Sequence, residues 1–166
     1  MARFVVVLPL VPLAAGDEFT VADWPLHITL VEPFATEHPA GIVADAVQAA
    51  TADSAVVRAT AGEEAMFGRR RDVPVTLVRD GGELAALRSR TLDALHRAGV
   101  DTGPMRADFR PHVTRKHHGR LGEGERIALD TVALIDMRPP EGSHHRRVVA
   151  AVRLGTASDP MARRSR

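Results

Sequence analysis

The sequence has no cysteine and no tyrosine, and only 4% of its 166 residues are aromatic. Without cysteine, disulfides, thiol catalysis and cysteine-ligated metal sites are excluded, and the scarcity of aromatic residues argues against a surface on which RNA bases stack. No apolar run is as long as a membrane span. The 22 basic and 21 acidic side chains leave a net charge of +1, which is too balanced for a protein that coats nucleic acid. We expect a globular, cytoplasmic monomer with no membrane partner.

The first 15 residues, MARFVVVLPLVPLAA, allow two interpretations. An early arginine, an apolar centre and small residues at the end resemble a short secretory signal. The single arginine and the prolines Pro9 and Pro12 argue against it, and the β-branched segment Phe4 to Leu8 is typical of a buried strand. We favour the strand.

Hydrophobic periodicity and turn residues predict an α+β protein with two halves of similar size. Two apolar stripes at helical spacing predict helices, one with Pro39 in its first turn and one between Asp80 and Gly99. The first stripe consists of Ile42, Val43, Ala46, Val47 and Ala50, and the second of Leu84, Leu87, Leu92 and Leu95. Strands are predicted at 3–10, 26–32, 55–61, 73–79, 110–116, 127–137 and 147–154. We expect residues 1–154 to form a single two-lobed domain and the polar, basic segment 155–166 to be a flexible tail.

Two tripeptides of the same composition occur 85 residues apart, one in each half of the chain. His27-Ile28-Thr29 lies in WPLHITLVEPF, and His112-Val113-Thr114 lies in FRPHVTRK. Because alternate residues of a strand share a face, each tripeptide presents an imidazole beside a hydroxyl, with the middle residue turned into the core. A lone histidine is more often structural, bonded to backbone, than functional. Two matching motifs in matching surroundings favour a shared functional cleft.

These motifs, together with the FVVVLPL strand and the leucine-striped helix, resemble the two-histidine (2H) phosphoesterase superfamily. The resemblance covers about residues 3–154 and lies in the branch of 2′-5′ RNA ligases and RNA 2′,3′-cyclic phosphodiesterases. It implies a 2H phosphoesterase-like fold in which two pseudo-symmetric antiparallel sheets with flanking helices surround a central cleft.

The resemblance implies an enzyme that hydrolyses 2′,3′-cyclic phosphates, at RNA ends or on small cyclic nucleotides, to 2′-phosphates, with reversible 2′-5′ ligation as a side activity. His27 and His112 are the expected acid and base, because imidazole exchanges protons near neutral pH. Thr29 and Thr114 are expected to donate hydrogen bonds to the phosphate oxygens. Such a site needs neither a metal nor another cofactor. Which histidine is the acid stays open at this point.

The sequence departs from the family pattern after the second motif. Members of the family usually have a hydrophobic residue directly after each His-x-Thr motif. Leu30 follows the first motif and fits this pattern, whereas Arg115 follows the second and does not. His117 stands where relatives often have arginine. Lys116 has the same strand parity as Thr114 and could supply positive charge to a phosphate. Candidate substrate contacts are therefore Lys116, Arg115, Arg110 and Phe67.

Other features allow weaker hypotheses. The pairs at 117–118 and 144–145 could suggest a histidine metal site, but no carboxylate pattern supports one. Arg69, Arg70 and Arg71 could grip an RNA backbone or form a solvated loop. A non-catalytic RNA- or nucleotide-binding module, and a phosphodiesterase of cyclic oligonucleotide signals, remain the alternative functions.

Overall fold

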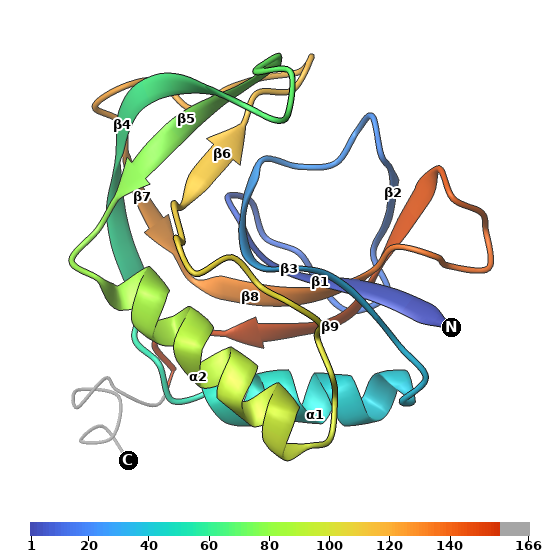
Figure 1. The fold of residues 1–166 in the computed structure, drawn as a ribbon. Helices are drawn as coiled ribbons and strands as arrows, with labels where there is room; N and C mark the ends of the chain where they lie inside the picture. Colours follow the sequence, from blue (N-terminus) through green and yellow to red (C-terminus); the bar gives the residue numbers. More distant parts are fainter. Residues whose placement is uncertain (157–166) are drawn as a thin grey trace.

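Nine strands and two helices make up the part of the chain that the computed structural model describes, residues 1–156 (Figure 1). The strands are β1 Ala2–Pro9, β2 Glu18–Thr20, β3 His27–Thr36, β4 Val57–Phe67, β5 Val73–Arg79, β6 His112–Thr114, β7 Arg126–Leu129, β8 Thr131–Asp136 and β9 His145–Arg153. The helices are α1 Ala40–Thr51 and α2 Glu83–Arg97. Most of the predicted tail, 157–166, lies outside the described residues. No helix within residues 1–156 has the length and apolar character that crossing a membrane requires.

All strand pairs are antiparallel, and their order is β2-β9-β8-β1-β3-β6-β5-β4-β7. The α+β prediction is confirmed. The two antiparallel sheets that the resemblance implied are joined into one continuous sheet, because β3 and β6 pair edge to edge through Ile28 and Val113. The sheet curls into a half-barrel, and both helices lie on one side of it (Figure 1).

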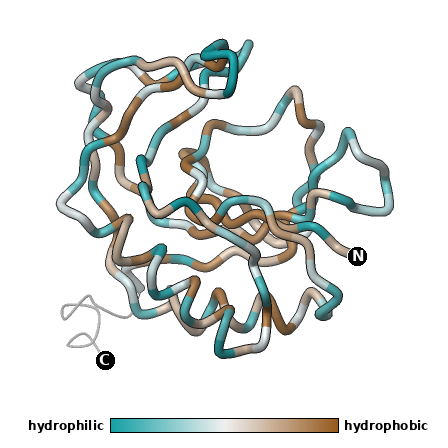
Figure 2. The backbone as a smooth tube through the Cα atoms, viewed as in Figure 1, coloured by the Kyte–Doolittle hydropathy of each residue, from teal (hydrophilic) through white to brown (hydrophobic). Residues whose placement is uncertain are grey.

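The main core lies between the sheet and the helices. Hydrophobic residues concentrate along the central strands and alternate with hydrophilic ones along the helices (Figure 2). The predicted stripes bury Val43 and Val47 of α1 and Leu84, Leu87 and Leu95 of α2. Burying side chains of this size contributes about 1.5–3 kcal/mol each. Ile42, which was assigned to the first stripe, is instead 42% exposed.

The first predicted strand is confirmed as β1, which pairs with β3 on one side and β8 on the other. Its residues Phe4 to Leu8 are at most 2% exposed. This segment is a central strand of the sheet.

Several predicted strands differ from the observed ones, and β4 continues to Phe67, beyond the predicted end at residue 61. β3 continues through Pro33 because the β1–β3 register shifts there, and a bulge tolerates a residue that has no N–H to donate. The strand predicted at 127–137 is divided at Asp130 into β7 and β8, which pair with β4 and β1 respectively. β6 covers only His112–Thr114 of the predicted 110–116, and β2 was missed because its three residues are too few to show a period.

Candidate active site

The two His-x-Thr motifs lie side by side on β3 and β6. The antiparallel pair Ile28–Val113 places His27 across from Thr114 and Thr29 across from His112. Ile28 and Val113 are 0% and 1% exposed in the main core, so the histidines and threonines project from the opposite face of the sheet. The pairing gives the motifs a local twofold relation, and directly opposed side chains in such a pair start only about 5 Å apart.

Both imidazoles are held by the same backbone contact. Nδ1 of His27 lies 2.8 Å from the carbonyl oxygen of Pro25, and Nδ1 of His112 lies 2.8 Å from that of Arg110. A carbonyl only accepts, so each Nδ1 carries the proton and donates it. Each Nε2 is then left to exchange a proton with a substrate, as a base when the ring is neutral and as an acid when it is charged.

His27 lies in the more enclosed of the two environments. Its ring stacks on Trp24, with centroids 4.5 Å apart, and Lys116 and Arg146 approach the same tryptophan at 5.7 and 5.4 Å. Burial is the main cause that lowers the pKa of His27 to about 4, and repulsion by Lys116 and His112 lowers it further. The hydrogen bond to the carbonyl of Pro25 raises this pKa but does not outweigh them. The ring of His27 is therefore neutral at pH 7.

His112 lies against the hairpin between β4 and β5. The edge of its ring contacts Phe67, with centroids 4.6 Å apart, and the guanidinium of Arg110 lies 5.0 Å from the centre of the Phe67 ring. Two of the predicted substrate contacts, Phe67 and Arg110, are thus beside the second histidine.

A cavity of about 800 Å³ opens next to Thr29 and His112. It is lined by residues from β3, the β4–β5 hairpin and the segment before β6: Thr29, Glu32, Pro33, Phe67, Gly68, Arg69, Arg106, Ala107, Asp108, Phe109, Arg110 and His112. Its volume is in the range that holds small-molecule ligands. Three arginines against two carboxylates line it, so it suits an anion.

A buried arginine ties the wall of this cavity to β3. Arg88 of α2, 5% exposed, donates to the carbonyl oxygens of Leu30 at 3.0 Å and Arg106 at 2.9 Å, and it forms an ion pair with Glu32. Its guanidinium also lies 4.8 Å from the ring centre of Phe109. Burial alone would raise the pKa of Glu32, but the hydrogen bonds from Arg88 and the Arg106 N–H outweigh it and hold that pKa below its usual value. Glu32 is therefore charged, and it anchors Arg88 and the backbone of Arg106 to β3.

The remaining predicted contacts divide into two groups. Lys116 lies near Trp24 in the same cluster as His27, and burial followed by repulsion from Arg146 lowers its pKa. Arg115 is exposed, and its backbone N–H donates to the carbonyl of Pro74. Its side chain makes no hydrogen bond or ion pair within residues 1–156.

The weaker sequence hypotheses also have positions in the structure. Arg69 lines the cavity, whereas Arg70 and Arg71 are exposed at the tip of the β4–β5 hairpin. No group of three histidines or carboxylates within residues 1–156 is arranged to hold a metal ion. His118 instead contacts the carbonyl oxygen of Trp24 at 3.1 Å.

Sequence reasoning missed Trp24, Arg88, Glu32 and the segment 106–109. Trp24 is the only tryptophan and lies three residues before His27, which is a signal that could have been used. Arg88 lies on the leucine-striped helix, where one buried arginine has no distinctive pattern.

Comparisons with known proteins identify relatives of this chain in sequence and in fold. The family model for the 2′-5′ RNA ligase superfamily matches residues 13–132, while no curated protein matches the sequence. Similar solved structures include Escherichia coli LigT complexed with NADP+ (TM-score 0.61, 16% identity, 93% of this chain and 98% of that chain). LigT complexed with 3′-AMP (0.57, 15%, 92% and 98%) and TT0787 of Thermus thermophilus (0.59, 18%, 93% and 98%) share the fold as well. The chain belongs to the 2′-5′ RNA ligase superfamily and is an enzyme of the two-histidine phosphoesterase kind.

Proposed function

We propose that the protein is a metal-independent phosphodiesterase that opens 2′,3′-cyclic phosphates to 2′-phosphates with His27 and His112 as its acid–base pair. The observation that carries the proposal is the paired geometry of the motifs. Each imidazole has its Nδ1 tied to a carbonyl and its Nε2 available, and each stands beside a threonine across one strand pair. The 3′-AMP and NADP+ bound in LigT structures support a nucleotide substrate for this fold.

The reaction balances with these groups alone. Nε2 of one neutral histidine takes a proton from water while the water oxygen forms a bond to phosphorus. The bond from phosphorus to the 3′ oxygen breaks, and the other, protonated histidine gives its proton to that oxygen. The hydroxyls of Thr29 and Thr114 donate to the non-bridging oxygens, where negative charge accumulates. Exchange with solvent then restores both protonation states.

His27 is the base in this proposal, and His112 is the acid. Burial, to which the stacked Trp24 contributes, and the nearby charge of Lys116 disfavour the protonated form of His27. A residue that is neutral before the substrate arrives can accept the proton of water without first losing one.

The pH dependence of kcat/KM should report this assignment. Protonation of His27 removes the base, so kcat/KM should fall as the pH drops through about 4, and loss of the proton of the acid His112 should give a separate limb on the alkaline side. Lys116→Met removes a charge that lowers the pKa of His27, so this variant should move the acid limb to higher pH. Circular dichroism at each pH separates titration from acid unfolding, and an acid limb centred near 6.5 in the folded wild type would refute the assignment.

The reaction itself is tested by product identification. The protein is incubated in EDTA with each nucleoside 2′,3′-cyclic phosphate, and the products are resolved from 2′- and 3′-phosphate standards. We expect the 2′-phosphate at an undiminished rate in EDTA, because imidazoles and hydroxyls supply every group the step needs. Tight binding without turnover would instead favour the non-catalytic module. Turnover confined to cyclic oligonucleotides would favour the signal-degrading alternative.

A further inference from the structure

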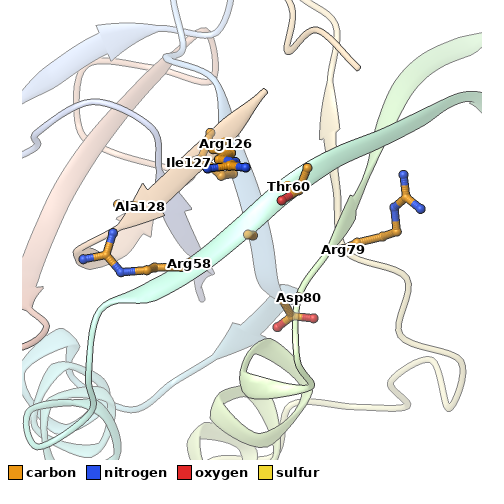
Figure 3. A pocket seen from close by; sticks show the side chains of 8 residues that line it. Arg58, Thr60, Arg79, Asp80, Arg126, Ile127 and Ala128 are labelled. Atoms are coloured by element: carbon orange, nitrogen blue, oxygen red, sulfur yellow. The ribbon is translucent and has the colours of Figure 1, made fainter. Parts of the chain in front are cut away.

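A second cavity, of about 720 Å³, lies on β4, β5 and β7, and none of its lining residues belongs to the catalytic motifs. It is lined by Arg58, Ala59, Thr60, Arg79, Asp80, Arg126, Ile127 and Ala128. In Figure 3 the guanidinium groups of Arg58 and Arg79 lie on opposite sides of Thr60. Three arginines thus border one open surface without converging on a single point.

Strand register places these arginines on the same face of the sheet as the catalytic residues. Thr60 pairs with Arg79 of β5 and with Arg126 of β7, so the three side chains form one row across three strands. Arg79 is two residues from Leu77, which pairs with His112. Since alternate residues share a face, Arg79 and His112 project from the same side, about 7 Å apart along the strand direction and one strand apart.

The charge of the three arginines in the cavity is largely uncompensated. Arg58, Arg79 and Arg126 are exposed and form no ion pair with any residue in the range 1–156. The one carboxylate in the cavity, Asp80, accepts a hydrogen bond at 2.7 Å from the N–H of Leu84 in the first turn of α2. A net positive surface is left beside the proposed catalytic cleft.

We propose that Arg58, Arg79 and Arg126 bind successive backbone phosphates of an RNA strand whose terminal cyclic phosphate lies between His27 and His112. This inference deepens the proposed function, on which it rests, because it assigns a surface that binds the RNA backbone beyond the terminal cyclic phosphate. Arg79 and Arg126 stand two strand spacings apart, about 10 Å, and the guanidinium groups of Arg58 and Arg79 point to opposite sides of Thr60 (Figure 3), a spread that suits several phosphates of an extended chain. Planar guanidinium groups suit phosphate oxygens, and such contacts carry no base specificity.

The test compares wild type with the triple variant Arg58→Gln/Arg79→Gln/Arg126→Gln. The control Arg90→Gln/Arg97→Gln/Arg138→Gln removes the same charge from exposed arginines elsewhere on the surface. Fluorescence anisotropy measures the affinity of each protein for a 12-nucleotide RNA that ends in a 3′-phosphate, over a range of salt concentrations. Hydrolysis of that RNA with a 2′,3′-cyclic end is compared with hydrolysis of the mononucleotide.

We expect the triple variant to bind the RNA ten- to a hundredfold more weakly than the control does. The slope of log affinity against log salt should fall by about 2, since single strands lose roughly 0.7 per phosphate contact. The ratio of kcat/KM for RNA to that for mononucleotide should fall at least tenfold in the triple variant and stay at the wild-type value in the control.

Failure of this inference and failure of the proposed function give different results. If both substrates are hydrolysed but the triple variant binds RNA as the control does, or if wild type does not bind RNA, the arginine site is wrong and the phosphodiesterase stands. If no cyclic phosphate is hydrolysed while RNA affinity still depends on the three arginines, the site stands and the proposed reaction is wrong.

Discussion

Replacing His27 or His112 by alanine is expected to lower kcat/KM for a 2′,3′-cyclic phosphate by about 10²–10⁴ each, because each change removes one of two proton transfers. Neither side chain is part of the main core, so the variants should remain folded. The double variant should be little worse than the more damaged single variant, since both groups act in one step and such effects are strongly non-additive. Steady-state kinetics with circular dichroism as a folding check measures this.

His144→Ala provides the matched control, because His144 is exposed and its only contact given by the structure uses its backbone carbonyl. It should keep wild-type activity. Equal activity of wild type and both site variants would exclude the two histidines as the catalytic pair.

Replacing Arg88 by methionine is expected to lower the free energy of unfolding by about 3 kcal/mol, because breaking a buried ion pair leaves the partner's charge uncompensated. The carboxylate of Glu32 would keep only the N–H of Arg106 as a donor from this network. That one bond would then be the remaining tie of the segment 106–109 to β3 within this network, so KM should rise more than kcat falls. Urea denaturation and steady-state kinetics measure the two effects.

The design of that experiment includes two further variants. Adding Glu32→Gln to Arg88→Met should recover part of the lost stability, because it removes the stranded charge. Arg90→Met, on the exposed part of the same helix, should change the free energy of unfolding by less than about 0.5 kcal/mol. If Arg88→Met behaved like Arg90→Met, the anchoring role of Arg88 would be wrong.

The parts of this account that depend on local sequence were predictable. Strand parity alone placed His27 beside Thr29 and turned Ile28 and Val113 into the core, and the structure has both residues at most 1% exposed. Helical spacing likewise identified Leu84, Leu87 and Leu95 as core residues of α2. Each of these inferences needs only the geometry of a single element.

The parts that depend on pairing between distant elements were not predictable. That Ile28 meets Val113, and so joins the two halves at the site, is a register choice between strands 85 residues apart. Arg88 and Glu32 are 56 residues apart, and Arg79 joins Thr60 and Arg126 in one row only through two strand pairings. A single sequence shows which face of each strand is apolar, but it does not show which residues of two distant strands pair.

The most direct test of two proton transfers at one phosphorus compares the leaving groups of two substrates. His27→Ala and His112→Ala are assayed on a nucleoside 2′,3′-cyclic phosphate and on a nucleoside p-nitrophenyl phosphodiester, whose p-nitrophenolate departs without a proton. The account predicts that His27→Ala stays slow on both substrates, whereas His112→Ala recovers most of its rate on the activated ester. Loss of activity on both substrates to the same extent in both variants, or no loss in either, would contradict it.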